Sequence, residues 1–259
     1  MAQSLWTFKR GNSPLVAAAI HDGHTVRPEV ADLMALSAIE RRREEDPFTG
    51  KWVTIADTQI VVHRSRFEVD LNRPRQKAVY LRPKDAWGLR VWQTRPPADL
   101  VVRSLAQYDA FYAEVQQLLS DLTRRFGRVV VFDLHTYNHR RAGPDAAPAD
   151  PAENPEVNIG TGTMDRAYWA PVVERFMADL RAFDFLGRQL DVRENIKFQG
   201  GQFSRWIHQN FPNSACAIAI EFKKFFMDEW SGQPEQHQLE TIHQALQATV
   251  PGVLKSLEQ

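Results

Sequence analysis

Short apolar runs recur along the chain, and each has the length of a buried strand rather than a helix. Residues 14–21 (PLVAAAIH), 128–135 (RVVVFDLH) and 214–226 (SACAIAIEFKKFF) predict three strands that are apolar on both faces. That pattern is typical of parallel strands covered by helices. Two shorter strands are expected within residues 58–74, and a strand followed by a turn is expected at 157–164.

Helical periodicity fills the intervals between these strands. Apolar residues at three- and four-residue spacing predict helices over residues 27–46, 104–127, 165–185 and 234–258, and a short helix after the Gly-Gly turn within 194–211. Pro28 suits the first turn of the first helix, while Ser104 and Gly127 suit the two ends of the second. The alternation predicts one α/β domain, residues 1–259, with a mostly parallel, twisted sheet flanked by helices.

The composition narrows the class of protein. Of 259 residues, 43% are hydrophobic and 25% charged, and 32 basic residues balance 32 acidic ones, so we expect no nucleic-acid partner. No apolar run approaches the ~20 residues of a membrane span, and MAQSLWTFKR lacks the apolar core of a signal peptide, so no membrane partner is expected. The single Cys216 suits a cytoplasmic protein, and it leaves His, Asp and Glu as the candidate metal ligands.

The three apolar strands end in side chains that bind metals or carry protons. These are His21, His135 and Glu221. If the strands are parallel, the three groups emerge at the edge of the sheet where α/β proteins bind ligands. Two imidazoles and one carboxylate make a three-ligand zinc site with a position open for water. The alternative is that each His is a satisfied polar residue at a strand–loop junction. Asp133 shares a sheet face with His135 and could accept its second ring N–H.

The sequence leaves the acidic metal ligand open. Residues 41–50 (RRREEDPFTG) offer Glu44, Glu45 and Asp46 at a helix C-terminus, where the helix dipole disfavours acids. A bound cation would compensate such a placement, although a solvated run of charges is the simpler interpretation. His24, in HDGH, is a rival ligand from the same turn as the first histidine.

Two arginines and one glutamate are candidates for binding and catalysis. Arg66 and Arg73 could each present a planar fork to a substrate carboxylate or a developing oxyanion, or they could form surface salt bridges. Glu221 follows the apolar stretch CAIAI, so burial should raise its pKa towards that of a general base. The alternative for this glutamate is a salt bridge to Lys223 or Lys224.

Six ordered segments resemble the N-formylglutamate amidohydrolase family, distant relatives of the zinc carboxypeptidases and aspartoacylases. They are IHDGH, RSRFEVDLNRP, FDLHT, VNIGT, FQGGQFSRWIH and AIAIEF, and they run from about residue 14 to 226 in the order of the family. The sequence departs from the family pattern twice. Ile20 stands where the family has Pro before its first His, and EEDPFTGKW replaces the commoner Asp-x-Asp-Trp segment.

The resemblance implies a fold like that of the zinc carboxypeptidases, in the phosphorylase/hydrolase-like group, and one Zn²⁺ per chain. It implies metal ligation by His21, His135 and an acid from Glu45 or Asp46, of which we prefer Asp46. The residues that it assigns to catalysis and substrate binding are Glu221, Arg66, Asn72, Arg73 and His208.

The expected function is therefore hydrolysis of an amide bond in a small N-acyl amino acid of the formyl type, such as N-formylglutamate. Glu221 would act as the base, one of Arg66 and Arg73 would stabilise the oxyanion, and the other would bind a carboxylate of this small substrate. His139, with Arg140 and Arg141, is expected to line the mouth of the site under the loop 142–156. The alternatives are a related zinc carboxypeptidase or deacylase with another substrate, and a non-catalytic carboxylate-binding protein.

Overall fold

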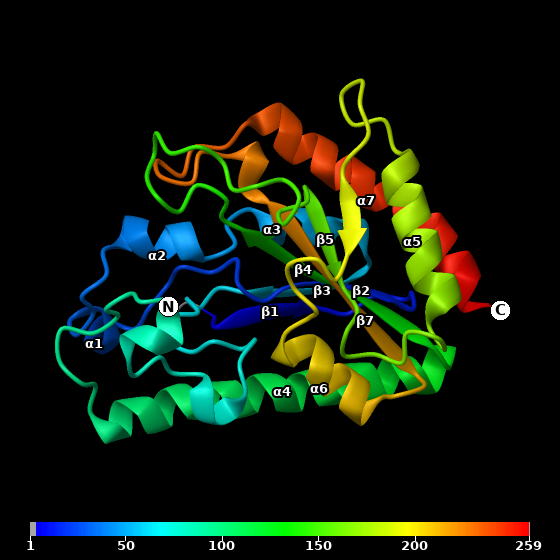
Figure 1. Ribbon diagram of the computed structural model, residues 1–259. Coiled ribbons are helices and arrows are strands. Elements are labelled where there is room, and N and C mark those ends of the chain that lie inside the picture. The colour runs from blue at the N-terminus through cyan, green and yellow to red at the C-terminus, as the bar shows by residue number, and fades with distance from the viewer. Residues whose placement is uncertain (1–3, 259) are drawn as a thin grey trace.

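Seven strands form one mixed sheet in the order β1-β3-β2-β4-β7-β5-β6 within residues 4–258, which are the residues that the computed structural model describes (Figure 1). The remaining residues of the predicted domain, 1–3 and 259, lie outside this description. The strands are β1 (Trp6–Lys9), β2 (Leu15–Ala19), β3 (Thr58–Val62), β4 (Val129–Tyr137), β5 (Val157–Gly160), β6 (Val192–Glu194) and β7 (Ala215–Lys223).

The three strands that the sequence marks as apolar on both faces are neighbours at the centre of this sheet. β2 pairs with β4 and β4 pairs with β7, in both cases parallel. β3 and β6 are also paired in parallel, with β2 and β5 respectively, whereas β1 and β5 run antiparallel to β3 and β7. The expectation of a mostly parallel sheet is therefore confirmed. Its consequence is that the carboxyl ends of β2, β4 and β7 meet at one edge.

Helices cover both faces of the sheet. They are α1 (Pro28–Ala31), α2 (Ala38–Glu44), α3 (Thr49–Trp52), α4 (Ala98–Phe126), α5 (Ala170–Ala182), α6 (Gln202–Asn210) and α7 (Gln236–Leu257). α4 and α6 pack on one face, and α5 and α7 on the other, so the core has two layers (Figure 1). Alternation along β4 serves both, because Val131 joins the first layer and Phe132 the second. No helix in residues 4–258 has the length and apolarity needed to cross a membrane.

The helix predicted over residues 27–46 is wrong in its continuity, because two short helices, α1 and α2, replace it. Between them the backbone turns aside, and the Ala35 N–H donates to the carbonyl of Val91 at 2.8 Å. A new helix then begins at a capping box, in which Ser37 and Glu40 bond each other's backbone N–H groups. A tertiary contact thus interrupts a locally helical pattern.

Only one of the two strands expected in residues 58–74 forms. After β3 the chain folds into turns, and the N–H groups of Glu68 and Arg73 donate to carbonyls three residues earlier. Ion pairs at i,i+4 spacing, such as Arg66 Nη2 to Asp70 Oδ2 at 2.9 Å, accompany these turns. The alternating pattern of this stretch therefore reflects a turn-rich segment that carries charged groups.

α4 starts earlier than predicted and ends as predicted. It begins at Ala98 after Pro97, and Ser104 is a buried interior residue whose hydroxyl accepts a hydrogen bond from Arg27 at 2.7 Å. Gly127 ends the helix with a φ of 74°, a conformation that glycine adopts without strain.

Candidate metal centre

Three predicted ligands lie together at the carboxyl edge of the central strands. One ligand atom from each of His21, Asp46 and His135 lies within 4.8 Å of the other two, and all three residues are buried. His21 follows β2, and His135 belongs to the neighbouring strand β4. Asp46 follows α2, and its backbone N–H donates to the carbonyl of His21 at 2.9 Å. That hydrogen bond fixes the acidic segment beside the first histidine.

Both imidazoles turn the same nitrogen toward the carboxylate. Nδ1 of His135 lies 2.9 Å from Asp46 Oδ2, and Nδ1 of His21 lies 3.4 Å from the same oxygen. The distance between the two ring centroids is 5.0 Å. The buried Nδ1 of His21 has no hydrogen-bond partner within the described chain. Two imidazole nitrogens and one carboxylate oxygen are donors that suit zinc and leave one coordination position open.

The charge of the cluster also suits a bound metal ion. Burial alone would raise the pKa of Asp46, but its contacts with His135 and His21 outweigh burial and hold that pKa well below its ordinary range. Burial lowers the pKa of His135, and the carboxylates of Asp133 and Asp46 more than reverse this effect. A buried carboxylate that stays ionised needs a cation nearby, either a proton on the histidines or a metal ion. The residues present therefore fit a divalent metal.

Each histidine has a second carboxylate on its other nitrogen. Nε2 of His21 lies 2.7 Å from Asp70 Oδ1, and Nε2 of His135 lies 2.9 Å from Asp133 Oδ1. Asp133 also accepts a hydrogen bond from the hydroxyl of Ser204 in α6 at 2.9 Å. Such outer carboxylates fix the orientation of a ligating imidazole and make it a stronger donor. Both His21 and His135 thus have Asp46 near Nδ1 and a second carboxylate near Nε2, which is the arrangement expected of histidines that bind a metal.

The rival acidic ligands point elsewhere. The Glu45 carboxylate accepts a hydrogen bond from the Ser65 hydroxyl and lies 3.5 Å from Nδ1 of His24. Glu44 pairs with Arg141 at 2.9 Å. Of the four groups that the sequence offered as a third ligand, only Asp46 joins the two histidines.

Glu221 stands on the strand next to His135. β4 and β7 pair in parallel with these two residues in register, and both line the same cavity. The predicted alternative of a salt bridge to a neighbouring lysine does not occur, since Lys223 donates to the Asn154 carbonyl and Lys224 to two carbonyls near α2. Burial raises the pKa of Glu221 to about 7, against opposing effects of His135 and other groups. A carboxylate with that pKa can take up and release a proton near neutral pH.

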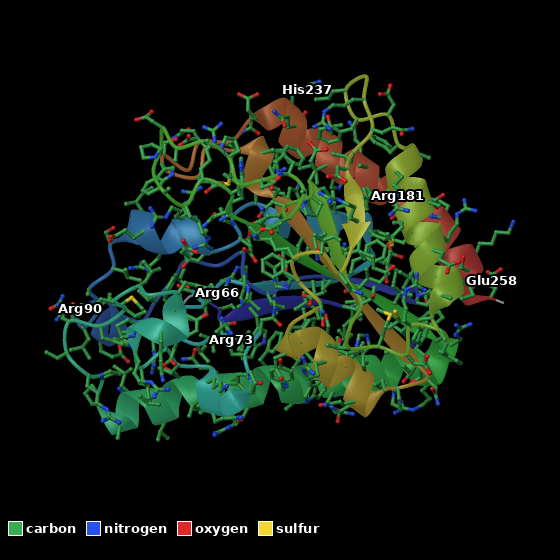
Figure 2. The ribbon with its side chains drawn as sticks, viewed as in Figure 1. Arg66, Arg73, Arg90, Arg181, His237 and Glu258 are labelled. Carbon is green, nitrogen blue, oxygen red and sulfur yellow. The ribbon has the colours of Figure 1, made fainter. Side chains whose placement is uncertain are left out.

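The cavity in front of these groups has a volume of about 380 Å³. Its charged lining is mostly basic, with Arg66, Arg73, Arg141, Lys197 and Lys224 against Glu44, Asp46 and Glu221. The side chains of Arg66 and Arg73 lie close together in Figure 2, and both contact Oδ2 of Asp70, at 2.9 and 3.7 Å. The lining favours an anionic ligand.

The guanidinium groups of Arg66 and Arg73 differ in how many protein partners they have. Arg66 donates to Asp70, to the Tyr80 hydroxyl at 3.3 Å and to the Glu44 carbonyl at 3.3 Å, and only 12% of its side chain is exposed. Within residues 4–258 the guanidinium of Arg73 makes one ion pair, at 3.7 Å to Asp70, besides its contact with the ring of Trp87, and 39% of its side chain is exposed. Arg73 therefore has more N–H groups available to bind a ligand than Arg66 has.

Asn72 connects the cavity wall to α6. Its Oδ1 accepts the N–H of Phe203 at 2.9 Å, and its Nδ2 lies 3.4 Å from Nε2 of His135. Gly201 allows this approach, because a Cβ added there would lie 2.2 Å from Asn72 Oδ1. The Gly-Gly turn therefore serves close packing against the site.

Two predicted substrate-binding histidines, His139 and His208, lie outside the lining of this cavity. Nε2 of His139 lies 3.5 Å from Glu229. His208 bonds the Thr163 hydroxyl through Nδ1 at 2.8 Å and accepts the Ala217 N–H through Nε2 at 2.9 Å. Burial lowers the pKa of His208 to about 4, which favours a neutral ring at neutral pH. Of the predicted mouth, Arg141 lines the cavity, but residues 142–156 contribute nothing to it.

Several groups at the site stand in stretches whose pattern does not mark them as functional. Asp70 was visible only as part of the motif RSRFEVDLNRP, and Lys197 and Trp87 stand in segments without a periodic pattern. For Lys224 the sequence suggests only a salt bridge to Glu221. Their placement depends on contacts between segments that are far apart in the chain.

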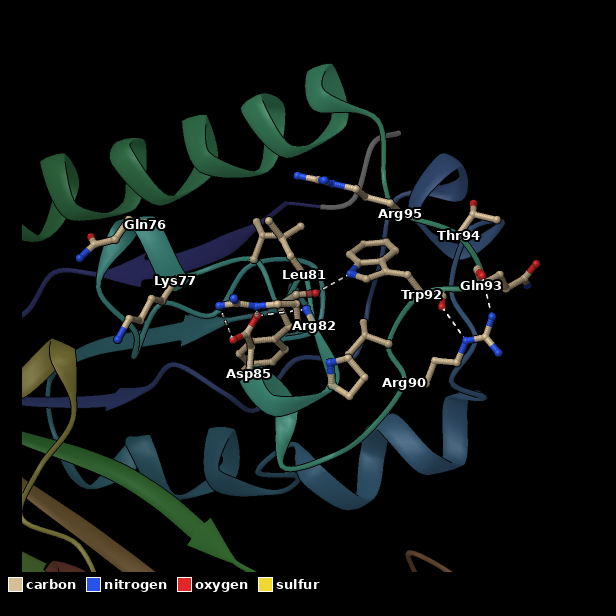
Figure 3. A pocket seen from close by; sticks show the side chains of 14 residues that line it. Gln76, Lys77, Leu81, Arg82, Asp85, Arg90, Trp92, Gln93, Thr94 and Arg95 are labelled. Carbon is tan, nitrogen blue, oxygen red and sulfur yellow. Dashed lines mark hydrogen bonds and ion pairs between the residues drawn. The ribbon is translucent and has the colours of Figure 1, made fainter.

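A larger cavity of about 690 Å³ lies between residues 76 and 95, away from the metal ligands (Figure 3). Its basic residues do not converge on a common point. Arg82 pairs with Asp85 at 3.4 Å, and Arg90 donates to the carbonyls of Trp92 and Gln93. Figure 3 shows the labelled Arg90 directed away from Arg82, so this cavity offers no comparable cluster.

Comparison with known proteins gives a family model and structures of similar fold. A family model described as N-formylglutamate amidohydrolase matches residues 13–227. The crystal structure of N-formylglutamate amidohydrolase from Ralstonia eutropha JMP134 has a TM-score of 0.74 at 15% identity, covering 97% of this chain and 96% of that one. A gene product from Agrobacterium tumefaciens has a TM-score of 0.69 at 16% identity, covering 96% and 93%. These likenesses show a shared fold. No curated protein sequence gives a significant match.

Proposed function

The chain belongs to the N-formylglutamate amidohydrolase family, and on that premise we propose that it hydrolyses the amide bond of a small N-acyl amino acid, such as N-formylglutamate, with one zinc ion per chain. One observation carries the proposal. Ligand atoms of His21, Asp46 and His135 lie within 4.8 Å of one another, and Glu221 occupies the adjacent strand position in the same cavity.

The metal would be held by Nδ1 of His21, Nδ1 of His135 and the carboxylate of Asp46. Asp70 and Asp133 would keep the Nε2 protons in place, so that each Nδ1 presents its lone pair. A bound zinc ion would acidify water and polarise the amide carbonyl.

Glu221 would accept a proton from the attacking water and deliver it to the leaving nitrogen. The new bond joins the water oxygen to the acyl carbon and the broken bond is C–N, which yields a carboxylic acid and an amine. A pKa of about 7 suits both halves of this transfer. The partly exposed Glu221 faces the cavity and forms no side-chain hydrogen bond within residues 4–258, so the carboxylate is free for it.

Arg73 is the better candidate for contact with the substrate. Its guanidinium is half-exposed and only weakly paired, and Asn72 lies beside it on the cavity wall. Arg66 is largely committed to Asp70 and would act mainly by holding that carboxylate against His21. The basic lining would favour a substrate that carries a carboxylate near the amide.

Metal analysis and two substitutions test this proposal. We expect about one zinc per purified chain, loss of the metal in His135→Ala, and retention of the metal in Glu221→Gln with kcat reduced about 10²- to 10⁴-fold. The exposed Glu174→Gln is the matched control, because it removes the same charge outside the cavity. Full hydrolysis by metal-free wild-type protein would refute the proposal.

The alternatives make different predictions in the same experiments. A related deacylase or carboxypeptidase would keep the metal and the dependence on Glu221, but it would prefer N-acetyl or dipeptide substrates over N-formyl amino acids. A carboxylate-binding protein without catalysis would bind its ligand equally well after Glu221→Gln. A screen over the three substrate types, with isothermal titration of the variant, separates these cases.

A further inference from the structure

Trp87 is an exposed aromatic residue at the cavity wall that neither the metal site nor the proposed chemistry explains. It lines the cavity with the metal ligands, and 44% of its surface is exposed. It follows the short helix Pro83–Ala86, and its φ of 52° lies in the left-handed region that bulky residues rarely adopt. Strained residues of this kind concentrate at functional sites. The position therefore suggests a role at the cavity.

Three guanidinium groups lie near the indole, two from the turn-rich segment 65–73 and one from the chain after β4. Their carbons lie 4.9 Å (Arg66), 5.7 Å (Arg73) and 5.9 Å (Arg141) from the ring centroid. An indole face attracts cations at these distances, and the cation–π attraction of Trp is stronger than that of Tyr or Phe. One ring thus gathers three like charges, which would otherwise repel each other, on one side of the cavity.

The contact matters most for Arg73, which has little else to hold it. Apart from Trp87, its one guanidinium partner within the described residues is Asp70, in an ion pair at 3.7 Å, whereas Arg141 has a carboxylate partner in Glu44 and Arg66 is almost buried. A flexible side chain that must be ordered on binding costs conformational entropy, and a contact that orders it beforehand reduces that cost.

We propose that Trp87 is a positioning residue for the substrate carboxylate, holding the guanidiniums of Arg73 and Arg141 over the cavity through cation–π contacts. The proposal rests on the proposed function, since it assigns the cavity to a carboxylate-bearing substrate. It makes Trp87 act on ligand binding through the arginines, so its effect should appear in affinity and KM and leave the chemical step nearly unchanged.

Three substitutions separate the electrostatic role of the ring from its bulk. Trp87→Phe keeps an aromatic face, while Trp87→Leu and Trp87→Met keep apolar bulk without one. Tyr168→Leu is the matched control, because Tyr168 is 42% exposed, has the Arg128 guanidinium 5.3 Å from its ring and lies outside the cavity lining. Thermal unfolding of each variant checks the fold, and the Met variant replaces the Leu variant if the latter fails to fold.

The readouts are the affinity for L-glutamate by isothermal titration and the KM and kcat for N-formylglutamate. We expect Trp87→Leu and Trp87→Met to weaken glutamate binding and raise KM about tenfold with kcat changed less than about twofold. For Trp87→Phe, glutamate affinity and KM should stay within about threefold of the wild-type values. Tyr168→Leu should have the wild-type values.

Equal effects of the Phe and Leu variants, or a loss confined to kcat, would overturn the inference, as would absence of glutamate binding by the wild-type protein. The glutamate titration does not depend on hydrolysis. If N-formylglutamate is not cleaved but the variants still rank as expected in glutamate affinity, the proposed function fails and the role of Trp87 stands. If N-formylglutamate is cleaved but the variants do not rank as expected, the role of Trp87 fails and the proposed function stands.

Discussion

His208 gives a quantitative test of the structure, because it is buried in a form that protonation would disrupt. Nε2 accepts the N–H of Ala217 in β7, at a position beyond the end of the pairing with β5, so the ring replaces a missing strand partner. A protonated ring cannot accept that bond. Burial is the main cause that lowers the pKa of His208 to about 4, from an ordinary value of 6.5.

The native state therefore binds this proton less readily than the unfolded chain. The stability that depends on a neutral His208 is fully present above pH 6.5 and is lost as the pH falls towards 4. The full loss corresponds to about 3 kcal/mol, of which roughly 2 kcal/mol falls between about pH 7 and about pH 5. His208→Gln keeps a donor and an acceptor but cannot be protonated, so it should not show this loss.

The assay is urea unfolding of wild type, His208→Gln and the exposed control His237→Gln at both pH values, with zinc in excess. The free energy of unfolding should fall about 2 kcal/mol less in His208→Gln than in the other two proteins over this interval. Parallel curves for all three would refute the buried, neutral assignment. A large fall in kcat/KM of His208→Gln at neutral pH would instead restore the substrate-binding role that the sequence suggested.

Three further substitutions test how the site is held. Asp70→Asn removes the carboxylate on His21 and should weaken zinc affinity about 10- to 100-fold, measured by competition with a chelator; unchanged affinity would contradict the orienting role. Gly201→Ala places a Cβ against the Asn72 amide and should lower kcat/KM more than it lowers the melting temperature, a result that wild-type kinetics would exclude. Lys224→Met leaves two backbone carbonyls without their donor and should cost about 1–3 kcal/mol in urea unfolding, whereas a more stable variant would show that burying the ammonium costs more than its hydrogen bonds contribute.

The sequence predicted the parts of the site that depend on strand ends. Three apolar runs that finish in His21, His135 and Glu221 were sufficient, because parallel pairing places such ends at one edge. The acidic ligand could not be chosen in the same way. Glu45 and Asp46 are neighbours with similar chemistry, and a long-range backbone bond from Asp46 to His21 decides between them.

Local patterns misled where tertiary contacts replaced local ones. Residues 65–73 alternate like a strand, but the segment folds into turns in which carboxylates such as Asp70 pair with arginines and support a histidine. His208 lies in a family-like motif, yet its partners are a threonine and an unpaired strand N–H. The sequence around Trp87 has no periodic pattern that would mark the residue. Its position depends on contacts with arginines from other segments of the chain.

The adjacency of β2 and β4 has a consequence for when the metal can be captured. The two histidines stand on strands that the chain lays side by side only after it has placed β3 and the long α4 between them in sequence. Such distant parallel pairing is a slow event in folding. Zinc uptake would therefore follow assembly of the middle of the sheet, and the ion would stabilise a nearly finished molecule instead of guiding its earliest steps. A nascent chain that stops short of residue 135 would hold only part of the ligand set.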